Sequence, residues 1–208
     1  MADSNLTKQA LSSALKELME EQPFEKISVS DICEQCHMNR KSFYYHFKDK
    51  YDLANWIFDT EFIELTKTHA LDVMNVSDSF EERLYGLVVV CEYFYENRSF
   101  YRRILQVEGQ NSFSSHFRDF LYTIVHHRVM DLAEHDNIPQ MVMDFIVDGF
   151  QCSIERWLLD KNCVTAEEFI GNLKQLIYVL IIWMKKCTQE DPGWIEKLQK
   201  YNKSGVTV

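Results

Sequence analysis

The chain has 208 residues, of which 46% are apolar and 26% are charged, and it carries a net charge of −10. This balance excludes an intrinsically disordered chain and supplies enough apolar side chains for a substantial core. Only six glycines and three prolines occur. With so few helix breakers and no runs of alternating β-branched residues, we expect an all-α fold.

The negative charge is distributed unevenly along the chain. Residues 39–50 hold four basic side chains, Arg40, Lys41, Lys48 and Lys50, and a single acidic one. Because the field at the contact face decides whether phosphates bind, a basic segment on an acidic body can still bind DNA. The net charge alone therefore does not exclude a nucleic-acid-binding protein.

The sequence predicts neither a secretory signal nor a membrane span. Its N-terminus is polar, and the longest apolar run, residues 176–184, is too short to cross a bilayer. The six cysteines have no regular spacing, so we expect reduced thiols that fill small buried spaces. We expect a cytoplasmic protein that does not associate with membranes.

The predicted elements begin with two helices. Apolar residues recur at helical spacing over residues 6–21, which predicts the first helix. Ser28 is a good N-cap, and Asp31 stands three residues later, as in a capping box. We therefore expect a short second helix that ends near Cys36.

Further N-caps predict the remaining helices. Asn39 is expected to cap a third helix over residues 40–47, and Asp49 a long fourth helix that reaches the vicinity of His69. Five more helices are expected near residues 80–96, 98–108, 111–135, 139–161 and 166–187.

Three short helices with a four-residue turn between the second and third are typical of a helix-turn-helix module, whose third helix enters the DNA major groove. On a helical wheel Phe43 and Phe47 share one face, suited to packing on the first two helices. Lys50, in the first turn of the fourth helix, could hold a phosphate together with free backbone N–H groups. The rest of the third helix can reach bases and phosphates through Arg40, Lys41, Ser42, Tyr44 and His46.

The stretch SVSDICEQCHMNRKSFYYHFKDKYDL, residues 28–53, resembles the helix-turn-helix signature of the TetR family of bacterial transcription regulators. Where that family usually has Gly in the turn, this chain has His37, a residue type enriched at positive φ, so we expect the turn to survive. The resemblance implies eight DNA-contacting residues: Ser28 and Ser30 on a phosphate or a base, Arg40, Lys41 and Ser42 on bases, and Tyr44, His46 and Lys50 on phosphates.

The second half is similar to the same family, and residues 94–105 and 149–170 resemble regulators of dihydroxyacetone-kinase operons. The family usually has a ligand pocket there, although aromatic residues at helical spacing are mostly core. Arg98, Arg102 and Arg103 could receive an anion or a partner protein, but charges at a helix start are more often solvated. The residues expected to line a pocket are Tyr93, Tyr101, Phe117 and Tyr122.

Residues 141–159 and 173–184 are apolar over most of the helix circumference. A helix of this kind is buried on several sides, and a second copy of the chain would supply the missing side. The alternative is a central helix in a larger monomer. The residues expected at a dimer interface are Phe150, Ile154, Trp157, Leu173, Ile177, Leu180 and Ile181.

Two patterns could indicate metal chemistry. Cys33 and Cys36 form a C-x-x-C pair, but no second pair stands at zinc-ribbon spacing. Glu34 and His37 form one E-x-x-H unit, whereas di-iron bundles need two. We expect no metal site, cofactor or catalytic residue, and a small helical-bundle enzyme or metal-binding protein is the alternative.

These features predict a helix-turn-helix domain over residues 1–50, a helical regulatory and dimerisation domain over 51–187, and a tail over 188–208. The expected function is that of a homodimeric transcriptional regulator, a repressor rather than an activator, that binds double-stranded DNA at a palindromic operator. A small-molecule effector or a co-regulator protein would control it. We expect no enzymatic activity.

Overall fold

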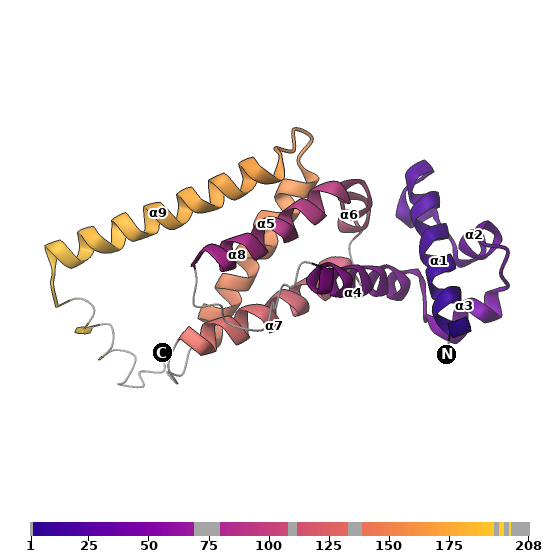
Figure 1. Cartoon of the computed structure of the whole chain (residues 1–208), viewed down its shortest axis with the longest axis horizontal. Helices are drawn as coiled ribbons and strands as arrows, with labels where there is room; N and C mark the ends of the chain where they lie inside the picture. The colour runs from indigo at the N-terminus through magenta and orange to yellow at the C-terminus, as the bar shows by residue number, and fades with distance from the viewer. Residues whose placement is uncertain are drawn as a thin grey trace. The chain divides into compact units, whose positions relative to one another are not determined.

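The computed structural model describes residues 2–68, 80–107, 112–132, 139–193, 196–197 and 200, and every regular element longer than one turn in them is an α-helix. The expected all-α fold is confirmed. The chain divides into two compact units, residues 1–164 and 165–208, which are treated separately. In chain order the elements are α1 (Ala2–Glu21), the 3₁₀ helix η1 (Phe24–Lys26), α2 (Val29–Gln35), α3 (Arg40–His46), α4 (Lys50–Thr68), α5 (Phe80–Glu96), α6 (Arg98–Leu105), α7 (Phe113–Leu132), α8 (Gln140–Leu159) and α9 (Ala166–Glu190) (Figure 1).

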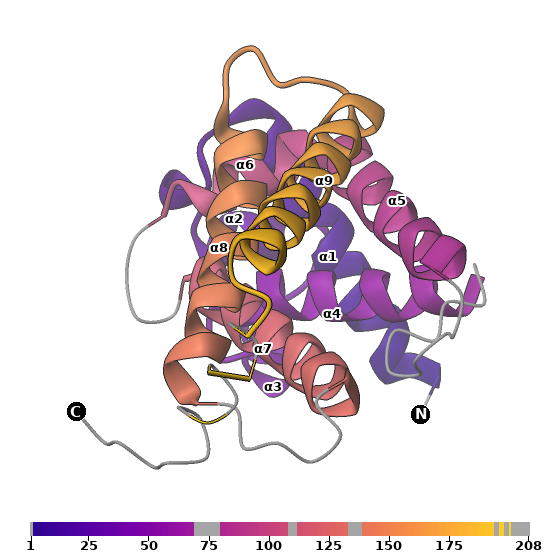
Figure 2. The ribbon, with the colours of Figure 1, turned by 90° about the vertical axis from the view of Figure 1, so that its left-hand side faces the viewer.

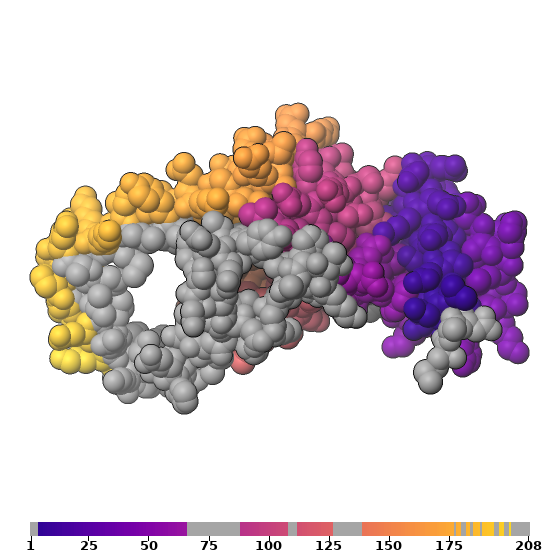
Figure 3. Space-filling view, in the orientation of Figure 1, coloured from indigo at the N-terminus to yellow at the C-terminus, as the bar shows by residue number. Residues whose placement is uncertain are grey.

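Helices α1, α2 and α3 pack around a small apolar core. Leu15 of α1, Ile32 of α2 and Phe43 of α3 are all fully buried, and Phe47 is 4% exposed. In the space-filling view the indigo surface of α1 adjoins the purple surface of α2 and α3 (Figure 3). The predicted inward face of the third helix, Phe43 and Phe47, is confirmed.

Side-chain caps fix where these short helices begin. The Ser28 amide donates to Asp31 Oδ2 at 2.7 Å and the Asp31 amide donates to Ser28 Oγ at 3.2 Å, which completes the predicted capping box. Asn39 Oδ1 accepts from the Ser42 amide at 2.8 Å. Asp49 Oδ1 accepts from the amides of Tyr51 and Asp52 at 2.9 Å each. The predicted starts of the second, third and fourth helices are therefore confirmed.

The turn between α2 and α3 depends on a left-handed residue. His37 has φ of 54°, and no other non-glycine residue in the described ranges has a positive φ. The turn closes with the Met38 amide donating to the Cys33 carbonyl at 2.8 Å and the His37 amide donating to that of Glu34 at 3.1 Å. The expectation that the turn survives with His37 in place of Gly is confirmed.

Helices α5, α6 and α7 pack around Phe58 of α4, whose side chain is fully buried. Its ring centroid lies 5.0 to 6.3 Å from five rings of α5, α6 and α7: Phe94, Tyr101, Phe113, Phe117 and Phe120. Phe58 therefore ties the helix that follows the helix-turn-helix module to three helices of the bundle.

Helices α7 and α8 lie against each other in both ribbon views (Figures 1 and 2). Arg118 of α7 joins them, because its Nη2 donates to Asp144 Oδ1 at 2.9 Å and its Nε donates to Asp148 Oδ1 at 2.7 Å. The two carboxylates raise the pKa of Arg118 further, and the guanidinium lowers the pKa of Asp144.

Some boundaries differ from those predicted. Helix α1 begins at Ala2, α6 ends at Leu105, and α9 continues to Glu190. The boundary predicted between residues 187 and 188 thus falls inside a helix. Residues 194–195, 198–199 and 201–208 of the predicted tail lie outside the described residues.

The second unit consists of α9 and the residues after it. Thr165 caps this helix, since its Oγ1 accepts from the Glu168 amide at 3.2 Å, which confirms the predicted start. Large apolar side chains stand exposed along its second half, among them Tyr178 and Trp183, which are 62% and 57% exposed.

Helices α4 and α7 are also joined by a titratable pair. His116 Nε2 lies 2.8 Å from Asp59 Oδ1, and the imidazole ring stands edge-on to Phe58 at 6.0 Å. The bond to Asp59 raises the pKa of His116, with further contributions from Asp119 and Asp52 that outweigh its partial burial.

The turn geometry makes a first prediction. His37→Gly should raise the free energy of unfolding by about 0.5–1 kcal/mol, because glycine adopts the left-handed conformation without a Cβ clash. His37→Val should lower it by at least about 1 kcal/mol. Urea denaturation measures both changes. As a control, Glu34→Gly within α2 should cost about 1 kcal/mol; a loss for His37→Gly as large as that control's would contradict the assigned strain.

The His116–Asp59 pair makes a second prediction. Because the folded pKa of His116 is raised above its unfolded value of about 6.5, the pair stabilises the fold fully below that pH and loses its effect as the pH rises through the folded pKa. The stability advantage of wild type over His116→Gln should therefore shrink between about pH 6 and pH 8. Urea denaturation at both values tests this, and a constant difference, or the same shrinkage in an Asp59→Asn background, would contradict it.

Candidate nucleic-acid interface

The outward face of α3 is basic and aromatic. Arg40 and Lys41 are exposed, Tyr44 is 51% exposed, and Ser42 and His46 are half-buried. Because Phe43 and Phe47 occupy the inner face, these five side chains lie where they can meet a ligand. The helix therefore has one anchored face and one free face, as a recognition helix requires.

Tyr45 was not among the predicted site residues. It is 82% exposed, more than Tyr44, and its ring meets that of His46 edge-on at 4.9 Å. An exposed tyrosine can donate a hydrogen bond to a phosphate. Its place directly after Tyr44 was the only signal in the sequence.

Three serine hydroxyls lie at the starts of α2 and α3. Ser28 Oγ accepts from the Asp31 amide, so its own O–H is still available as a donor. Ser42 Oγ donates to Asn39 Oδ1 at 3.2 Å, so its lone pairs are available as acceptors. Ser30 is half-buried in the first turn of α2. Each of the first two hydroxyls thus combines a capping contact with one unused bonding function.

The guanidinium of Arg40 lies over the ring of Tyr44, with its central carbon 5.9 Å from the ring centroid. Stacking on an aromatic face restricts the rotamers of an arginine and leaves its N–H groups free to bond a base edge. The contact partly pre-organises Arg40 before any ligand arrives.

Lys50 is half-buried, and its ammonium is bonded to the backbone. Its Nζ donates to the carbonyl oxygens of Phe24, Glu25 and Ile27 at 2.7, 2.9 and 2.8 Å. An ammonium has three protons, so these three bonds use them all. Burial lowers the pKa of Lys50, while Glu25 is the strongest of three acidic neighbours that oppose the shift. A phosphate contact by Lys50 would therefore have to replace one of these bonds.

Three of the four predicted pocket residues lie in the core. Tyr101 is fully buried, and Phe117 and Tyr93 are 2% and 8% exposed, whereas Tyr122 is half-buried on the outside of α7. The hydroxyl oxygens of Tyr93 and Tyr101 are 2.5 Å apart, and that of Tyr93 donates to Glu61 Oε2 at 2.8 Å. Burial raises the pKa of both tyrosines, so both remain neutral.

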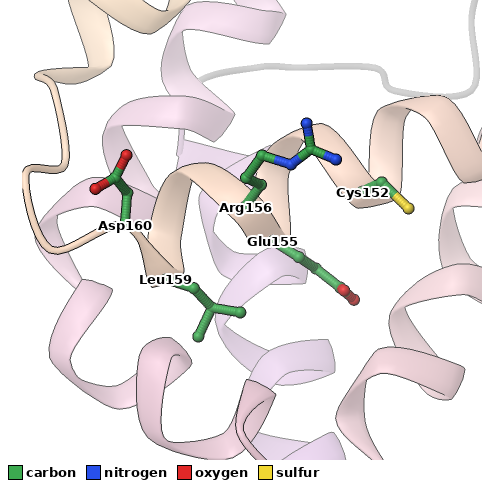
Figure 4. A pocket seen from close by; sticks show the side chains of 5 residues that line it. All are labelled: Cys152, Glu155, Arg156, Leu159 and Asp160. Atoms are coloured by element: carbon green, nitrogen blue, oxygen red, sulfur yellow. The ribbon is translucent and has the colours of Figure 1, made fainter.

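A hollow of about 480 Å³ lies along the C-terminal half of α8, where its lining side chains project from a single helix (Figure 4). It is an open depression in the surface, since one helix and the residue after it supply all of its described lining. These residues are Cys152, Glu155, Arg156, Leu159 and Asp160.

The residues predicted for a dimer interface are divided between interior and surface. Ile154 and Trp157 are buried at 7% and 5% exposure, and Trp157 donates through Nε1 to the Val164 carbonyl at 2.8 Å. Phe150 is 42% exposed and Leu173 is half-buried. The side chains of Ile177, Leu180 and Ile181 lie outside those the structure describes. Of these residues, Phe150 alone is exposed in the described set.

The described residues hold neither a metal-binding cluster nor a membrane-spanning helix. Among the described residues, no three His, Cys, Asp or Glu side chains come together in a group that could hold a metal ion. Burial raises the pKa of the Cys33 and Cys36 thiols, which disfavours the thiolates that metals bind. Within the same described ranges, no helix is long and apolar enough to span a membrane.

Two family models match most of the chain. The model described as "Bacterial regulatory proteins, tetR family" matches residues 11–56, which cover α2, α3 and parts of α1 and α4. The model described as "Transcriptional regulator C-terminal region" matches residues 81–179, from α5 into α9. Both describe transcriptional regulators and not enzymes.

A curated relative carries the subgroup resemblance. The HTH-type dhaKLM operon transcriptional activator DhaS of Lactococcus lactis is 30% identical over 108 residues. That match covers 52% of this chain and 54% of the relative, so it spans about half the length of the curated protein.

Solved structures share the fold. The dihydroxyacetone kinase operon activator DhaS aligns with a TM-score of 0.56 and 22% identity over 84% of this chain and 96% of the other. A TetR regulator from Streptococcus agalactiae aligns with a TM-score of 0.60 and 22% identity over 85% and 96%. NalD of Pseudomonas aeruginosa aligns at 0.57 with 17% identity over 85% and 96%. With both family models matched and the fold shared, the chain belongs to the TetR family of transcriptional regulators.

Proposed function

We propose that the chain is a homodimeric regulator that binds a palindromic operator through α3. The observation that carries this proposal is the division of α3 into a buried face, Phe43 and Phe47, and an exposed face that begins with Arg40 and Lys41. A short helix held in this way can insert its free face into a major groove, where arginine bonds guanine and lysine or tyrosine bonds phosphate.

The proposed contacts follow from exposure and from the free bonding functions. Arg40, Lys41 and Ser42 contact bases, because they occupy the first turn of α3 and recognition helices read bases near their N-termini. Tyr44 and His46 hold phosphates farther along the helix. At the start of α2, Ser28 and Ser30 contact a phosphate or a base. Lys50 is the remaining predicted contact, and its three carbonyl bonds suggest a role in positioning the backbone instead.

Dimerisation is proposed from exposed apolar surface. Met141 and Phe145 of α8 are 77% and 80% exposed, and Tyr178 and Trp183 of α9 are 62% and 57% exposed. Large apolar side chains exposed in this way, here on each of the two units, are typical of surfaces that a partner covers. A second copy related by a two-fold axis would cover them and would present two α3 helices to half-sites about 34–36 Å apart.

Regulation is proposed to act through an effector, in the cytoplasm where the DNA lies. Tyr93, Tyr101 and Phe117 are buried in the core, so a small effector that binds there would have to displace these side chains, whereas a partner protein could dock on the outside without opening the core.

Thermal denaturation with metabolites and with cell extract, followed by DNA binding with each hit, separates the two classes of effector. An effector that stabilises the fold but leaves DNA affinity unchanged does not regulate.

The direction of control is proposed as repression. The named relatives act in both directions, since DhaS is an activator and NalD is the secondary repressor of an efflux pump. A reporter fused to the bound promoter decides the matter: expression that rises when the chain is absent supports repression, and expression that falls supports activation.

The DNA-binding proposal predicts a specific effect of Arg40→Ala. Affinity for the preferred duplex, selected by the wild-type chain from random DNA, should fall by about 1–3 kcal/mol, and preference at one base pair should relax. Tyr44→Phe should weaken binding evenly across sequences. Fluorescence anisotropy with preferred and base-substituted duplexes measures both. Lys161→Ala, the loss of an exposed cation in the loop after α8, is the matched control. Unchanged base preference in folded Arg40→Ala would refute the contact.

The dimer proposal predicts a mass near twice 24.8 kDa by light scattering. Trp183→Glu and Phe145→Glu should shift the mass toward that of the monomer, because an unpaired carboxylate inside an apolar interface is costly. Both side chains are exposed within the chain, so the monomer should still fold. Leu6→Glu on α1, also at an exposed apolar position, should leave the mass unchanged. A wild-type monomer at micromolar concentration would contradict the proposal.

A further inference from the structure

Residues 20–27, which end α1, form η1 and lead into α2, are here termed the α1–α2 connection. Two cations from different helices bind its backbone. Arg103 of α6 donates through Nη1 to the Gln22 carbonyl at 2.9 Å and through Nη2 to the Glu20 carbonyl at 3.0 Å. The Glu20 carbonyl belongs to the last turn of α1, where oxygen atoms have no partner within the helix, and the Gln22 carbonyl to the residue that follows the helix. Arg103 thus caps α1 from a helix that is more than 80 residues away in sequence.

The other half of the α1–α2 connection is bound from α4. The three carbonyls that accept from Lys50 belong to Phe24, Glu25 and Ile27. The ammonium also lies 4.7 Å from the centroid of the Phe24 ring, which is 2% exposed. Lys50 therefore holds η1 against the N-terminus of α4. Together Arg103 and Lys50 bind five carbonyls within eight consecutive residues.

Helix α6 is itself held at its other end. Arg98, its first residue, donates through Nε to the Leu158 carbonyl at 2.9 Å and through Nη2 to that of Asp160. The Leu158 carbonyl belongs to the last turn of α8 and Asp160 is its C-cap, so α6 has one arginine on the C-terminal end of α8 and another on that of α1. Four buried side chains of α6 anchor it in the core: Phe100, Tyr101, Ile104 and Leu105. A helix of eight residues spans about 12 Å, short enough to move as a rigid piece.

The α1–α2 connection leads directly into the proposed DNA-binding elements. Ile27 is followed by Ser28, the N-cap of α2, and α2 leads through the His37 turn into α3. A displacement of α6 would therefore pull on the carbonyls of Glu20 and Gln22 and change the angle of α2 and α3. Charge-assisted hydrogen bonds are stronger than neutral ones, so the two bonds from Arg103 can transmit a displacement of α6 to the α1–α2 connection.

We propose that Arg103 and Lys50 are positioning residues, which set the orientation of α2 and α3 through the α1–α2 connection and link it to α8 by way of α6 and Arg98. The proposal rests on the proposed function, since orientation matters only if α3 binds DNA. Neither residue touches DNA in this account. It assigns a role to two of the three basic side chains of α6 and an alternative role to Lys50.

The test compares Arg103→Gln with Arg102→Gln in the full-length chain. Both remove one positive charge from adjacent positions of α6, but among the described contacts only Arg103 bonds the α1–α2 connection. The first readout is hydrogen exchange at the amides of Gln22, Lys26 and Ile27, which bond the carbonyls of Leu18, Pro23 and Phe24. Exchange at these amides should accelerate in Arg103→Gln and stay at the wild-type rate in Arg102→Gln.

The second readout is the preference for half-site spacing. Affinity is measured for the preferred duplex and for the same duplex with one base pair inserted between the half-sites. The ratio of the two affinities should fall by about fivefold or more in Arg103→Gln, the lower end of couplings between sites in proteins. The salt dependence of binding should not change, because Arg103 contacts no phosphate. Arg103→Lys, which can still reach one carbonyl, should restore part of the ratio.

Lys50→Met separates positioning from phosphate contact. A positioning role predicts lower affinity with an unchanged salt slope, whereas loss of a phosphate contact reduces the slope by about one.

An unchanged spacing ratio in Arg103→Gln despite faster exchange would overturn the positioning role. Unchanged exchange would show that Arg103 does not stabilise the α1–α2 connection, the contact here called the clamp. Should Arg103→Gln fail to fold, Arg103→Lys carries the same comparison. A wild type that binds no DNA would defeat the proposed function, while hydrogen exchange would still test the clamp.

Discussion

The carbonyl groups that a helix leaves unpaired at its C-terminus are the constraint on which the first unit of this protein depends. In α1 and α8 these carbonyls accept hydrogen bonds from arginines at the two ends of α6. A third cation, Lys50, satisfies the carbonyls of η1. Because each bond joins a side chain of one helix to the backbone of another, meeting this local requirement also fixes how the helices are arranged.

The division of the basic side chains between internal bonds and the surface explains how an acidic chain can present a basic face. Several basic side chains are engaged inside the fold: Lys50 with η1, Arg98 and Arg103 with helix ends, and Arg118 with two aspartates. Arg40 and Lys41 of α3 remain exposed, next to Tyr44 and Tyr45. A field sufficient for phosphate binding needs only such a local group of cations, and the rest of the surface can stay acidic.

Local features of the sequence were enough to predict the module around α2 and α3. Ser28, Asn39 and Asp49 cap helices with side chains two or three residues from their targets, and Phe43 and Phe47 follow the helical period, so both signals lie within one short stretch. The roles of Arg98 and Arg103 in α6 were harder to predict. Their acceptors are backbone carbonyls 60 to 83 residues away, for which a sequence has no marker, and the solvated role expected for Arg98 and Arg103 was wrong. Periodicity also could not tell that Ile154 and Trp157 face inward while Phe145 faces out, because all three are apolar positions of one helix.

The salt dependence of DNA binding by the wild-type chain is the sharpest test of DNA recognition through α3. Affinity for the selected palindromic duplex and for a scrambled duplex of equal length is measured from about 50 to 200 mM salt. DNA recognition through α3 predicts a steep linear fall of log affinity with log salt for both duplexes, and a preference for the selected duplex of about 10³-fold or more. Equal affinity for the two duplexes, or an affinity that does not respond to salt, would contradict it.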